Sequence, residues 1–237
     1  MENLKKWYSF AENGAYKGSE PNFFDVRQQP WAKLLENHYE VILKEFEKTI
    51  AARDKNIVPY LNQTLASKAE NWTVFPLFMW SKKNEENCSK CPETTKIIES
   101  IPAMTSCLFS VLKADTRIKP HFGDSNVMYR CHLTLNCKNG LPEIGMRIRD
   151  EQTTWQNGKL FAFCDAYEHE VWNNTTEDRW VLIIDVLREE FAHEKKTICS
   201  EVNATLWWQL KFQNFYFLDH FPAWARKVVM KMTSWFF

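Results

Sequence analysis

Two histidines and two arginines between residues 110 and 186 are the side chains of this sequence best suited to chemistry. His121 follows a proline and precedes a turn-prone Gly-Asp-Ser-Asn run, and His169 lies beside a second apolar run. Neutral imidazoles on separate strands can bind a metal ion, and arginine can hold a carboxylate through paired hydrogen bonds. Each histidine alone is more often a satisfied structural group. Together with Arg130 and Arg179, the pair makes a metal site as good an interpretation as a structural one.

Side-chain alternation along residues 127–135 separates the two faces of a predicted strand. Arg130 and His132 share one face with Met128 and Thr134. The opposite face carries only Val, Tyr, Cys and Leu. We therefore expect the second face to pack in the core, and the first to meet either water or a polar interior.

Arg179 opens an apolar run that extends to residue 186 and is expected to form a buried strand. Arginine is almost never fully buried without an anionic partner. No carboxylate of the sequence is an obvious partner for Arg179, so the run leaves room for an anionic ligand.

The elements that must position these residues are mainly strands. Short strand-like runs separated by turn residues are predicted at 71–80, 105–113, 127–136, 144–149, 159–164 and 179–187. Many short strands without interleaved helices favour an antiparallel sandwich or jelly roll. The predicted fold class is mainly β with flanking helices. No repeat or linker divides the chain.

Helices are expected before this β-rich region. Apolar residues recur at helical spacing from Trp31 to about residue 52, after Pro30 at a suitable first position, and we expect this helix on the outside of the main sheet. Weaker helices are predicted at 61–69 and, after a polar loop at 82–90, at 93–99. The first 30 residues read as an extended, aromatic-rich arm. The Cys-x-x-Cys pair in this region has no matching second pair, so a surface loop is favoured over a zinc site.

The C-terminal segment, residues 199–237, mixes aromatic and basic residues. It is predicted to be a cap that docks on the domain or on a partner, with a membrane-interface segment as the alternative. Its aromatic residues are Trp207, Trp208, Phe212, Phe215, Tyr216, Phe217, Phe221, Trp224, Trp235, Phe236 and Phe237, and its basic residues are Lys211, Arg226, Lys227 and Lys231. Residues 1–198 are predicted to form a single domain with a core at about 100–188 and helical support at its N-terminal side.

Composition and charge bear on three classes of protein: nucleic-acid-binding, secreted and membrane-spanning proteins. The formal net charge is 0, which gives no electrostatic argument for nucleic acid. The first residues lead into no apolar stretch typical of a secretory signal, and no run reaches the length of a membrane-spanning helix. The 7 cysteines are an odd number and lie mostly in apolar runs. We expect a cytoplasmic protein with reduced thiols, peripheral to a membrane if the C-terminal segment binds one.

The β-rich block resembles the aspartyl/asparaginyl β-hydroxylase family of iron- and 2-oxoglutarate-dependent dioxygenases. The order and spacing of the motifs hold over roughly residues 100–188 and are specific only jointly; the final fifty residues do not match. The matching runs are Ser110-Val111-Leu112, Pro120-His121-Phe122-Gly123 with Asn126, Arg130-Cys131-His132-Leu133, Trp155 with Gly158-Lys159, Asp165 with Glu168-His169-Glu170-Val171-Trp172, and Arg179 through Asp185-Val186.

The resemblance implies a role for each of six residues and a double-stranded β-helix (jelly roll, cupin-like) as the fold. By this resemblance, His121 and His169 bind Fe(II). Ser110 and Arg179 hold the distal carboxylate of 2-oxoglutarate, and Arg130 and His132 hold its C1 end. The implied reaction uses 2-oxoglutarate and O2, releases succinate and CO2, and hydroxylates an unactivated C–H bond.

The third ligand of a common iron triad is a carboxylate two residues after the first histidine. That position is Gly123 here, and the resembled family also lacks the carboxylate, with water in its place. Asp124 is one residue further on and is a departure. Residues three apart on a strand face opposite sides, so we expect Asp124 to point away from the metal unless the turn at Gly123 redirects it.

Three interpretations remain open. The first is a hydroxylase, and the second is a non-catalytic ligand-binding module on the same fold. A zinc-dependent or cupin-like metal protein unrelated to 2-oxoglutarate is the third, and Arg179 argues against it. For a hydroxylase, the substrate is an aspartyl or asparaginyl side chain, a lipid acyl chain or a small molecule, and the sequence does not choose among them.

Overall fold

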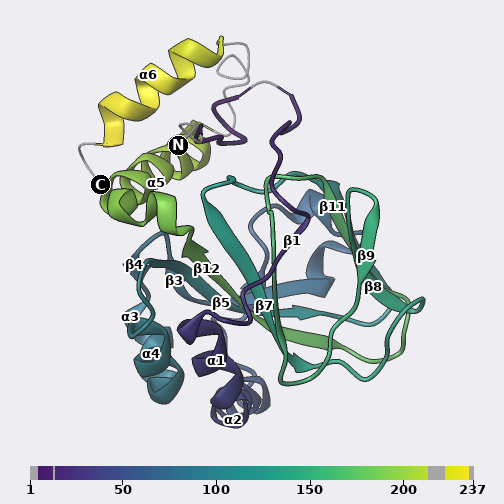
Figure 1. Ribbon diagram of the computed structural model, residues 1–237. Coiled ribbons are helices and arrows are strands. Elements are labelled where there is room, and N and C mark those ends of the chain that lie inside the picture. Colours follow the sequence, from purple (N-terminus) through teal and green to yellow (C-terminus); the bar gives the residue numbers. More distant parts are fainter. Residues whose placement is uncertain (1–4, 13, 213–221, 235–237) are drawn as a thin grey trace.

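The computed structural model describes residues 5–12, 14–212 and 222–234, and its core is a pair of antiparallel sheets (Figure 1). The larger sheet has the order β1-β10-β7-β12-β5-β3-β2, with β4 paired to β3, and the smaller has the order β6-β11-β8-β9. The strands are β1 (Phe23–Phe24), β2 (Val58–Pro59), β3 (Trp72–Met79), β4 (Lys82–Lys83), β5 (Met104–Leu112), β6 (Thr116–His121), β7 (Met128–Asn136), β8 (Ile144–Ile148), β9 (Glu151–Thr153), β10 (Leu160–Phe163), β11 (His169–Asn173) and β12 (Arg179–Leu187).

The strand order confirms the double-stranded β-helix. From β5 to β12 the chain alternates between the sheets, apart from the hairpin of β8 and β9, and supplies β5, β12, β7 and β10 to the larger sheet. The other four form the smaller sheet. β12, the last strand, lies between β5 and β7 and pairs with both. This arrangement leaves an interior between the sheets, into which alternate side chains of both sheets point.

The sequence predicted the strands of the larger sheet well and those of the smaller sheet poorly. The predicted runs correspond to β3, β5, β7, β8, β10 and β12. β6 and β11, which carry the two histidines, were not among them. Both are short and mix charged with apolar side chains, because one face of the smaller sheet meets solvent.

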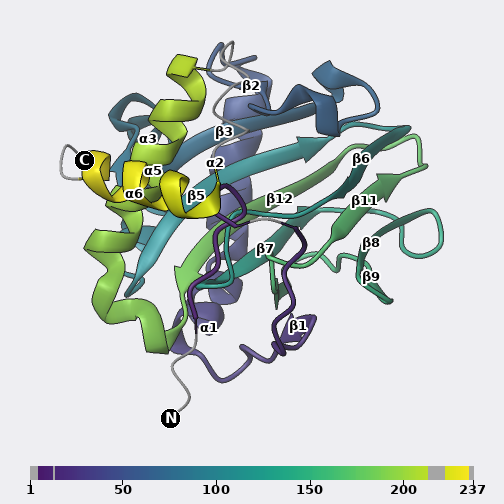
Figure 2. The same ribbon diagram turned by 90° about the horizontal axis from the view of Figure 1, so that it is seen from above.

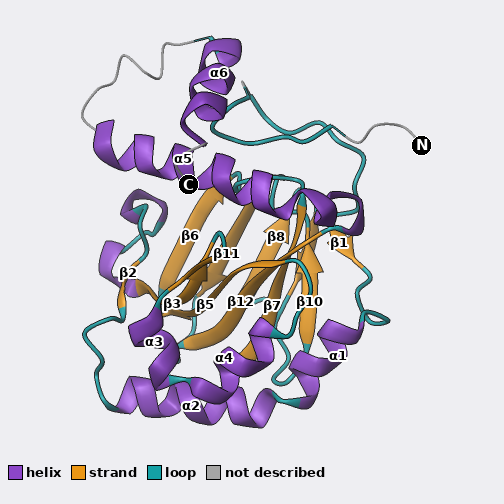
Figure 3. Ribbon diagram, turned by 90° about the vertical axis from the view of Figure 1, so that its left-hand side faces the viewer, coloured by secondary structure: helices purple, strands orange, loops and turns teal. Residues whose placement is uncertain are grey.

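Six helices flank the sheets: α1 (Pro30–Asn37), α2 (Tyr39–Ala51), α3 (Glu85–Lys90), α4 (Pro92–Glu99), α5 (Lys195–Phe212) and α6 (Ala223–Thr233) among the described residues. Figure 3 shows α1 to α4 on one side of the strands and α5 and α6 across the other end. Apolar residues of α1 and α2, such as Leu35, Ile42 and Phe46, share a core with β5, β7 and β12. The prediction that this helical segment packs outside the main sheet is confirmed.

Three helix predictions need correction. The single helix predicted at 31–52 is two helices, because His38 leaves helical geometry (φ −105°, ψ 12°) and its Nδ1 lies 2.8 Å from the Leu34 carbonyl oxygen. The predicted helix at 61–69 is wrong: short 3-10 turns at Gln63–Leu65 and Ala69–Asn71 occupy it. The predicted loop at 82–90 contains α3, whose first turn is capped by the Asn84 side chain.

The arm and the C-terminal helices meet at one end of the sandwich (Figure 2). The arm is extended as predicted, apart from turns and the short strand β1. α5 packs on the domain through Ile198 and Val202, which share a cluster with Leu187 and Phe191. The predicted aromatic residues Phe215, Tyr216, Phe217, Phe221, Trp235, Phe236 and Phe237 lie outside the described residues.

All seven cysteines are free and buried. Burial raises the pKa of Cys88 and Cys91, the Cys-x-x-Cys pair, so both stay protonated at neutral pH. Their surroundings are those of small hydrophobic side chains.

Candidate active site

The six residues singled out in the sequence line one cavity between the two sheets. The volume of this cavity is about 80 Å³. Ser110 is on β5, Arg130 and His132 are on β7, and Arg179 is on β12, all in the larger sheet, whereas the two other histidines come from the smaller sheet. The polar face predicted for residues 127–135 therefore meets a polar interior, and its opposite face is packed against the helices.

His121 and His169 face each other across adjacent strands. They are register partners at the end of β6 and the start of β11, and their ring centroids are 4.2 Å apart. Nδ1 of His121 lies 2.8 Å from the Lys119 carbonyl oxygen, and Nδ1 of His169 lies 2.9 Å from that of Tyr167. A carbonyl oxygen only accepts, so each Nδ1 carries the proton and each Nε2 has a lone pair for a metal.

Burial sets the charge of both imidazoles. It lowers the pKa of His121, and it lowers the pKa of His169 well below its ordinary value, with the neighbouring His121 adding to the effect. Both rings are thus neutral at pH 7, which is the form that binds metals.

Asp165 fills the space beside Gly123. A Cβ atom at position 123 would lie 1.8 Å from Oδ2 of Asp165. That carboxylate accepts from the Asp124 backbone N–H at 2.7 Å, and its Oδ1 lies 3.7 Å from Nε2 of His169. A side chain at 123 is excluded because a carboxylate from the loop before β11 occupies its volume.

Arg130 lies among three carboxylates. Its Nε and Nη2 donate to the two oxygens of Asp185 at 2.9 Å each, and its Nη1 donates to Asp165 at 2.8 Å. Nη2 is also 3.5 Å from Oδ2 of Asp124, so the side chain of Asp124 faces Arg130 along the cavity wall. These contacts use four of the five N–H donors of a guanidinium and leave one on Nη1.

His132 is a neutral hydrogen-bond donor. Nε1 of Trp155 donates to its Nδ1 at 3.3 Å, so the proton of the imidazole is on Nε2. Burial lowers the pKa of His132 well below its ordinary value, and the nearby Arg179 and Arg130 lower it further. The Nε2–H group can therefore donate to a ligand in the cavity.

Arg179 is the most unusual buried group of the site. It is 1% exposed, and its Nε and Nη1 have no hydrogen-bond partner among residues 5–12, 14–212 and 222–234. Its guanidinium carbon lies 4.6 Å from the ring centre of Trp155, and no carboxylate of the described residues forms an ion pair with it. Burial lowers its pKa to about 10, so it is still a cation at neutral pH. The predicted burial of this strand is confirmed, and Arg179 at its start is buried with it.

Ser110 is fully buried and lines the same cavity. Its hydroxyl oxygen accepts from Nε1 of Trp72 at 3.1 Å. The hydroxyl proton is then left to donate, and a carboxylate is a suitable acceptor.

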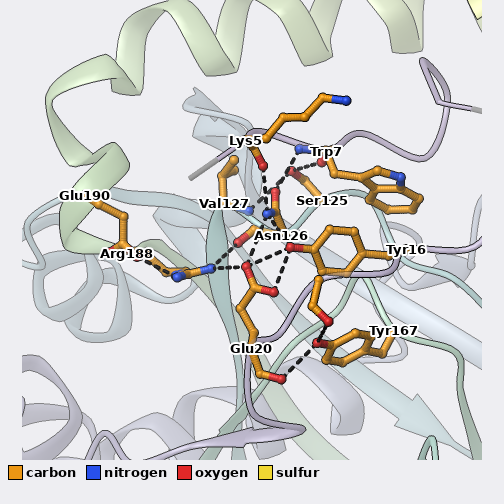
Figure 4. A network of polar contacts seen from close by, with 11 residues as sticks. Lys5, Trp7, Tyr16, Glu20, Ser125, Asn126, Val127, Tyr167, Arg188 and Glu190 are labelled. Atoms are coloured by element: carbon orange, nitrogen blue, oxygen red, sulfur yellow. Dashed lines mark hydrogen bonds and ion pairs between the residues drawn. The ribbon is translucent and has the colours of Figure 1, made fainter. Parts of the chain in front are cut away.

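The loop between β6 and β7 is held by the N-terminal arm (Figure 4). Oδ1 of Asn126 accepts from the Trp7 backbone N–H at 2.9 Å, and its Nδ2 donates to the Lys5 carbonyl and the Tyr16 hydroxyl. Arg188 donates at 2.8 Å to Glu20 and at 3.0 Å to the Asn126 carbonyl. The chain segment that follows His121 is thus fixed by residues more than a hundred positions earlier.

Sequence reasoning gave no role to the carboxylates of this site. Asp165 and Asp185 were noticed only as parts of motifs. An acidic residue four positions before His169 was the available signal for Asp165. Asp185 was readable as a charged residue inside an otherwise apolar run, directly opposite Arg130 in register.

No group of three or more His, Cys, Asp or Glu side chains in the described ranges is arranged to hold a metal ion. Within the same ranges, no helix is both long enough and apolar enough to cross a membrane.

Comparisons with known proteins agree on one family. Residues 36–189 match the family model described as aspartyl/asparaginyl beta-hydroxylase. The chain is 31% identical over 172 residues to an ornithine lipid ester-linked acyl 2-hydroxylase from Rhizobium tropici, covering 71% of this chain and 61% of the relative. It is 29% identical over 213 residues to the aspartyl/asparaginyl beta-hydroxylase of Homo sapiens, covering 81% of this chain and 27% of that protein.

The chain thus spans less than two thirds of the length of these relatives. Among solved structures, a prolyl-4-hydroxylase from Pseudomonas putida is similar with a TM-score of 0.42 and 15% sequence identity, covering 67% of this chain and 88% of that chain.

Proposed function

Because the chain belongs to the aspartyl/asparaginyl β-hydroxylase family, we propose that it is an Fe(II)- and 2-oxoglutarate-dependent hydroxylase. The observation that carries this proposal is Arg179, a buried cation whose Nε and Nη1 have no hydrogen-bond partner in the part of the chain that the structure describes. A buried charge without a partner costs several kcal/mol. A dicarboxylate cosubstrate would supply the missing anion.

The residues present suit both absent groups. His121 and His169 would hold Fe(II) through Nε2, since hydrogen bonds fix both Nδ1 atoms as donors. Arg179 and the Ser110 hydroxyl would hold the distal carboxylate of 2-oxoglutarate. The C1 end would be held by the Nε2–H of His132 and the remaining N–H of Arg130.

Bound Fe(II) would activate O2 and couple the decarboxylation of 2-oxoglutarate to the hydroxylation of a C–H bond. The residues of the chain would bind the cosubstrate and orient it. Arginine offers a planar pair of donors to a carboxylate, and Trp155 positions both His132, by a hydrogen bond, and Arg179, by stacking. Two neutral imidazoles, Fe(II) and doubly negative 2-oxoglutarate sum to zero charge, so this set needs no further anionic ligand.

The remaining cavity wall suits an apolar substrate group better than a carboxylate. Met79, Trp80 and Leu108 line it. Besides Arg179, the cavity lining contains the cation Arg130, which three carboxylates already surround. An aspartyl side chain entering here would meet carboxylates without a free cation. Of the substrates named for the two relatives, we therefore favour a lipid acyl chain.

The test of the cosubstrate assignment is direct. Under anaerobic conditions, the protein with Fe(II) and 2-oxoglutarate should develop the weak visible absorption of an iron–2-oxoglutarate chelate. His121→Ala and His169→Ala should each lose this absorption and the release of succinate on exposure to air, while circular dichroism stays unchanged. His38→Ala is a matched control, because His38 lies between α1 and α2, away from the cavity. Normal turnover in either ligand variant would refute the assignment.

A non-catalytic binding module on the same fold is the alternative. Such a module would bind Fe(II) and 2-oxoglutarate anaerobically yet release no succinate in air, with or without added substrate. The chelate absorption and the succinate assay therefore separate the two functions on one sample.

Substrate class is tested by stimulation of succinate release. An acylated lipid dispersed in detergent is expected to stimulate it, with an oxygen atom added to the acyl chain by mass spectrometry. A peptide with a single aspartate should have little effect. Stimulation by the peptide and not by the lipid would overturn the preference for an acyl chain without affecting the cosubstrate proposal.

A further inference from the structure

Helix α6 presents an apolar stripe to its outer face. Trp224, Val228 and Met232 are 70%, 49% and 70% exposed. Their spacing of four residues places them on one face of the helix. Lys231, also exposed, lies next to them. Large exposed apolar side chains that form a group, unlike scattered ones, mark a surface that binds something.

Specific contacts hold the other side of α6 against the protein. Nη1 of Arg226 donates to the Phe10 carbonyl at 3.2 Å, and Lys227 forms an ion pair with Glu12 of the arm. α6 also packs on α5 (Figure 1), which is anchored in the domain through Ile198. The outward orientation of the stripe is thus fixed by polar contacts with the arm and by packing on α5.

Charge is distributed unevenly between the domain and this segment. Residues 195–237 contain six basic and two acidic residues, a formal net charge of +4, whereas the whole chain has a net charge of 0. The same 43 residues contain 11 of the aromatic side chains of the chain. Within this segment, α6 itself contains three basic residues, no acidic residue and the aromatic Trp224. A positive helix with large apolar side chains on its outer face has the composition that binds at the interface of anionic lipids.

We propose that the outer face of α6 binds the surface of an anionic lipid bilayer, with the helix lying in the plane of the interface. At 11 residues, α6 is much shorter than the ~20 residues that span a bilayer. A second copy of the chain is a poorer occupant. Three exposed side chains offer far less than the ~800 Å² per partner of a stable protein interface.

The helical segment touches the wall of the active-site cavity. Asn203 of α5 donates to the Trp80 carbonyl oxygen at 2.9 Å. In the arm, which α6 contacts, the Ser9 backbone N–H donates to the Asp124 carbonyl oxygen at 3.0 Å. Trp80 and Asp124 both line the cavity. Binding through α6 would therefore bring lipid to the end of the sandwich at which these lining residues lie.

The experiment measures sedimentation with vesicles in the absence of iron and 2-oxoglutarate. The protein should sediment with vesicles of phosphatidylcholine containing phosphatidylglycerol, and less with phosphatidylcholine alone. The triple variant Trp224→Ser/Val228→Ser/Met232→Ser should bind at least about tenfold more weakly, which corresponds to about 1.4 kcal/mol. Lys231→Glu should reduce the preference for phosphatidylglycerol vesicles.

A matched triple variant replaces exposed apolar residues elsewhere, Val41→Ser/Val58→Ser/Leu61→Ser, and should bind vesicles like the parent. Circular dichroism of both triple variants shows whether they are folded. Failure of the parent to bind, or equal binding by the α6 variant, would overturn the proposal. So would a lipid-free dimer that the α6 variant converts to monomer, because the stripe would then join two copies. None of these results depends on hydroxylase activity.

Discussion

Arg179 is the residue whose replacement tests the cosubstrate site most directly. Arg179→Ala removes the buried cation expected to pair with the distal carboxylate of 2-oxoglutarate. A charge-assisted hydrogen bond contributes about 1.5–3 kcal/mol, so the apparent affinity for 2-oxoglutarate should fall by about ten- to a hundredfold. Titration of the anaerobic chelate absorption measures this change.

Arg179→Lys is the matched control for charge. Lysine restores the cation without the planar pair of donors, so it should recover only part of the affinity. An Arg179→Ala variant that binds 2-oxoglutarate as tightly as the parent would remove this arginine from the site.

Gly123 is expected to tolerate no side chain. In Gly123→Ala, the new Cβ would meet the Asp165 carboxylate at 1.8 Å, so the loop or Asp165 must move. Because the same loop follows His121, we expect metal affinity to fall by more than about tenfold, whereas global stability changes less. Isothermal titration with Mn(II) measures the affinity. Gly140→Ala is a suitable control, since its Cβ would meet no atom closer than 3.6 Å; equal affinities in the two variants would contradict the expectation.

Asp124 is expected to be dispensable for metal binding. Its side chain faces Arg130 at 3.5 Å, and Arg130 keeps Asp165 and Asp185 when Asp124 is replaced. Asp124→Ala should therefore retain metal binding and most of the activity. Loss of metal binding with an unchanged circular dichroism spectrum would identify Asp124 as a third ligand.

The surroundings of a site residue were predictable where residues nearby in the sequence determine them. Burial of the strand that begins at Arg179 was predictable because both of its faces are apolar, and Arg179 was singled out because no carboxylate of the sequence was its obvious partner. The neighbours of Arg130 were not, because Asp165 and Asp185 come from segments 35 and 55 positions away. Hydrogen bonds between distant strands leave no periodic signal in a sequence.

At the scale of elements, the N-terminal arm acts as a clamp on the loop after β6. Arg188→Ala would leave the Glu20 carboxylate buried without its cation. Removing one partner of a buried pair typically costs about 3–5 kcal/mol, and urea unfolding measures the loss. Arg27→Ala, which breaks an exposed pair with Asp25, is the control and should leave the free energy of unfolding nearly unchanged. A loss of stability in Arg188→Ala as small as that in Arg27→Ala would show that the clamp contributes little.

The clamp also predicts a pH dependence. Burial raises the pKa of Glu20, but hydrogen bonds from Tyr16 and Arg188 outweigh burial and lower it overall. A depressed carboxyl pKa stabilises the fold above the unfolded pKa of about 4.3, and this stability is lost as the pH falls through the folded pKa. The free energy of unfolding of Glu20→Gln should therefore fall less steeply than that of the parent below about pH 5. Equal slopes would exclude Glu20 as a contributor.

Elements differed in how well the sequence predicted them. β5, β7 and β12 are long and apolar, and the interior fixes their pattern. The helix predicted at 31–52 is interrupted at His38 although its apolar spacing continues, since periodicity does not show where a helix changes direction. α3 was missed because a polar six-residue helix depends on its Asn84 cap more than on an apolar face.

For the whole molecule, binding of Fe(II) and 2-oxoglutarate should raise the melting temperature. A ligand that binds only the folded state, at a concentration about 100 times its dissociation constant, stabilises that state by about 2.7 kcal/mol. We expect this effect from Fe(II) and 2-oxoglutarate. For a chain of this size, this corresponds to a rise in Tm of roughly 5–10 °C. Anaerobic melting curves measure it. Arg179→Ala at the same concentrations should show a much smaller rise, and an equal rise would mean that the cosubstrate binds elsewhere.

The central place of β12 has a consequence for synthesis of the protein. Among the strands of the described residues, β12 is made last, and it pairs with β5 and β7, which are made long before it. Until residue 187 has left the ribosome, both earlier strands present open backbone edges, which are prone to pair with other chains. The nascent chain is thus at greatest risk of aggregation before β12 emerges, and any protection it receives from chaperones must last until this strand enters the gap between β5 and β7.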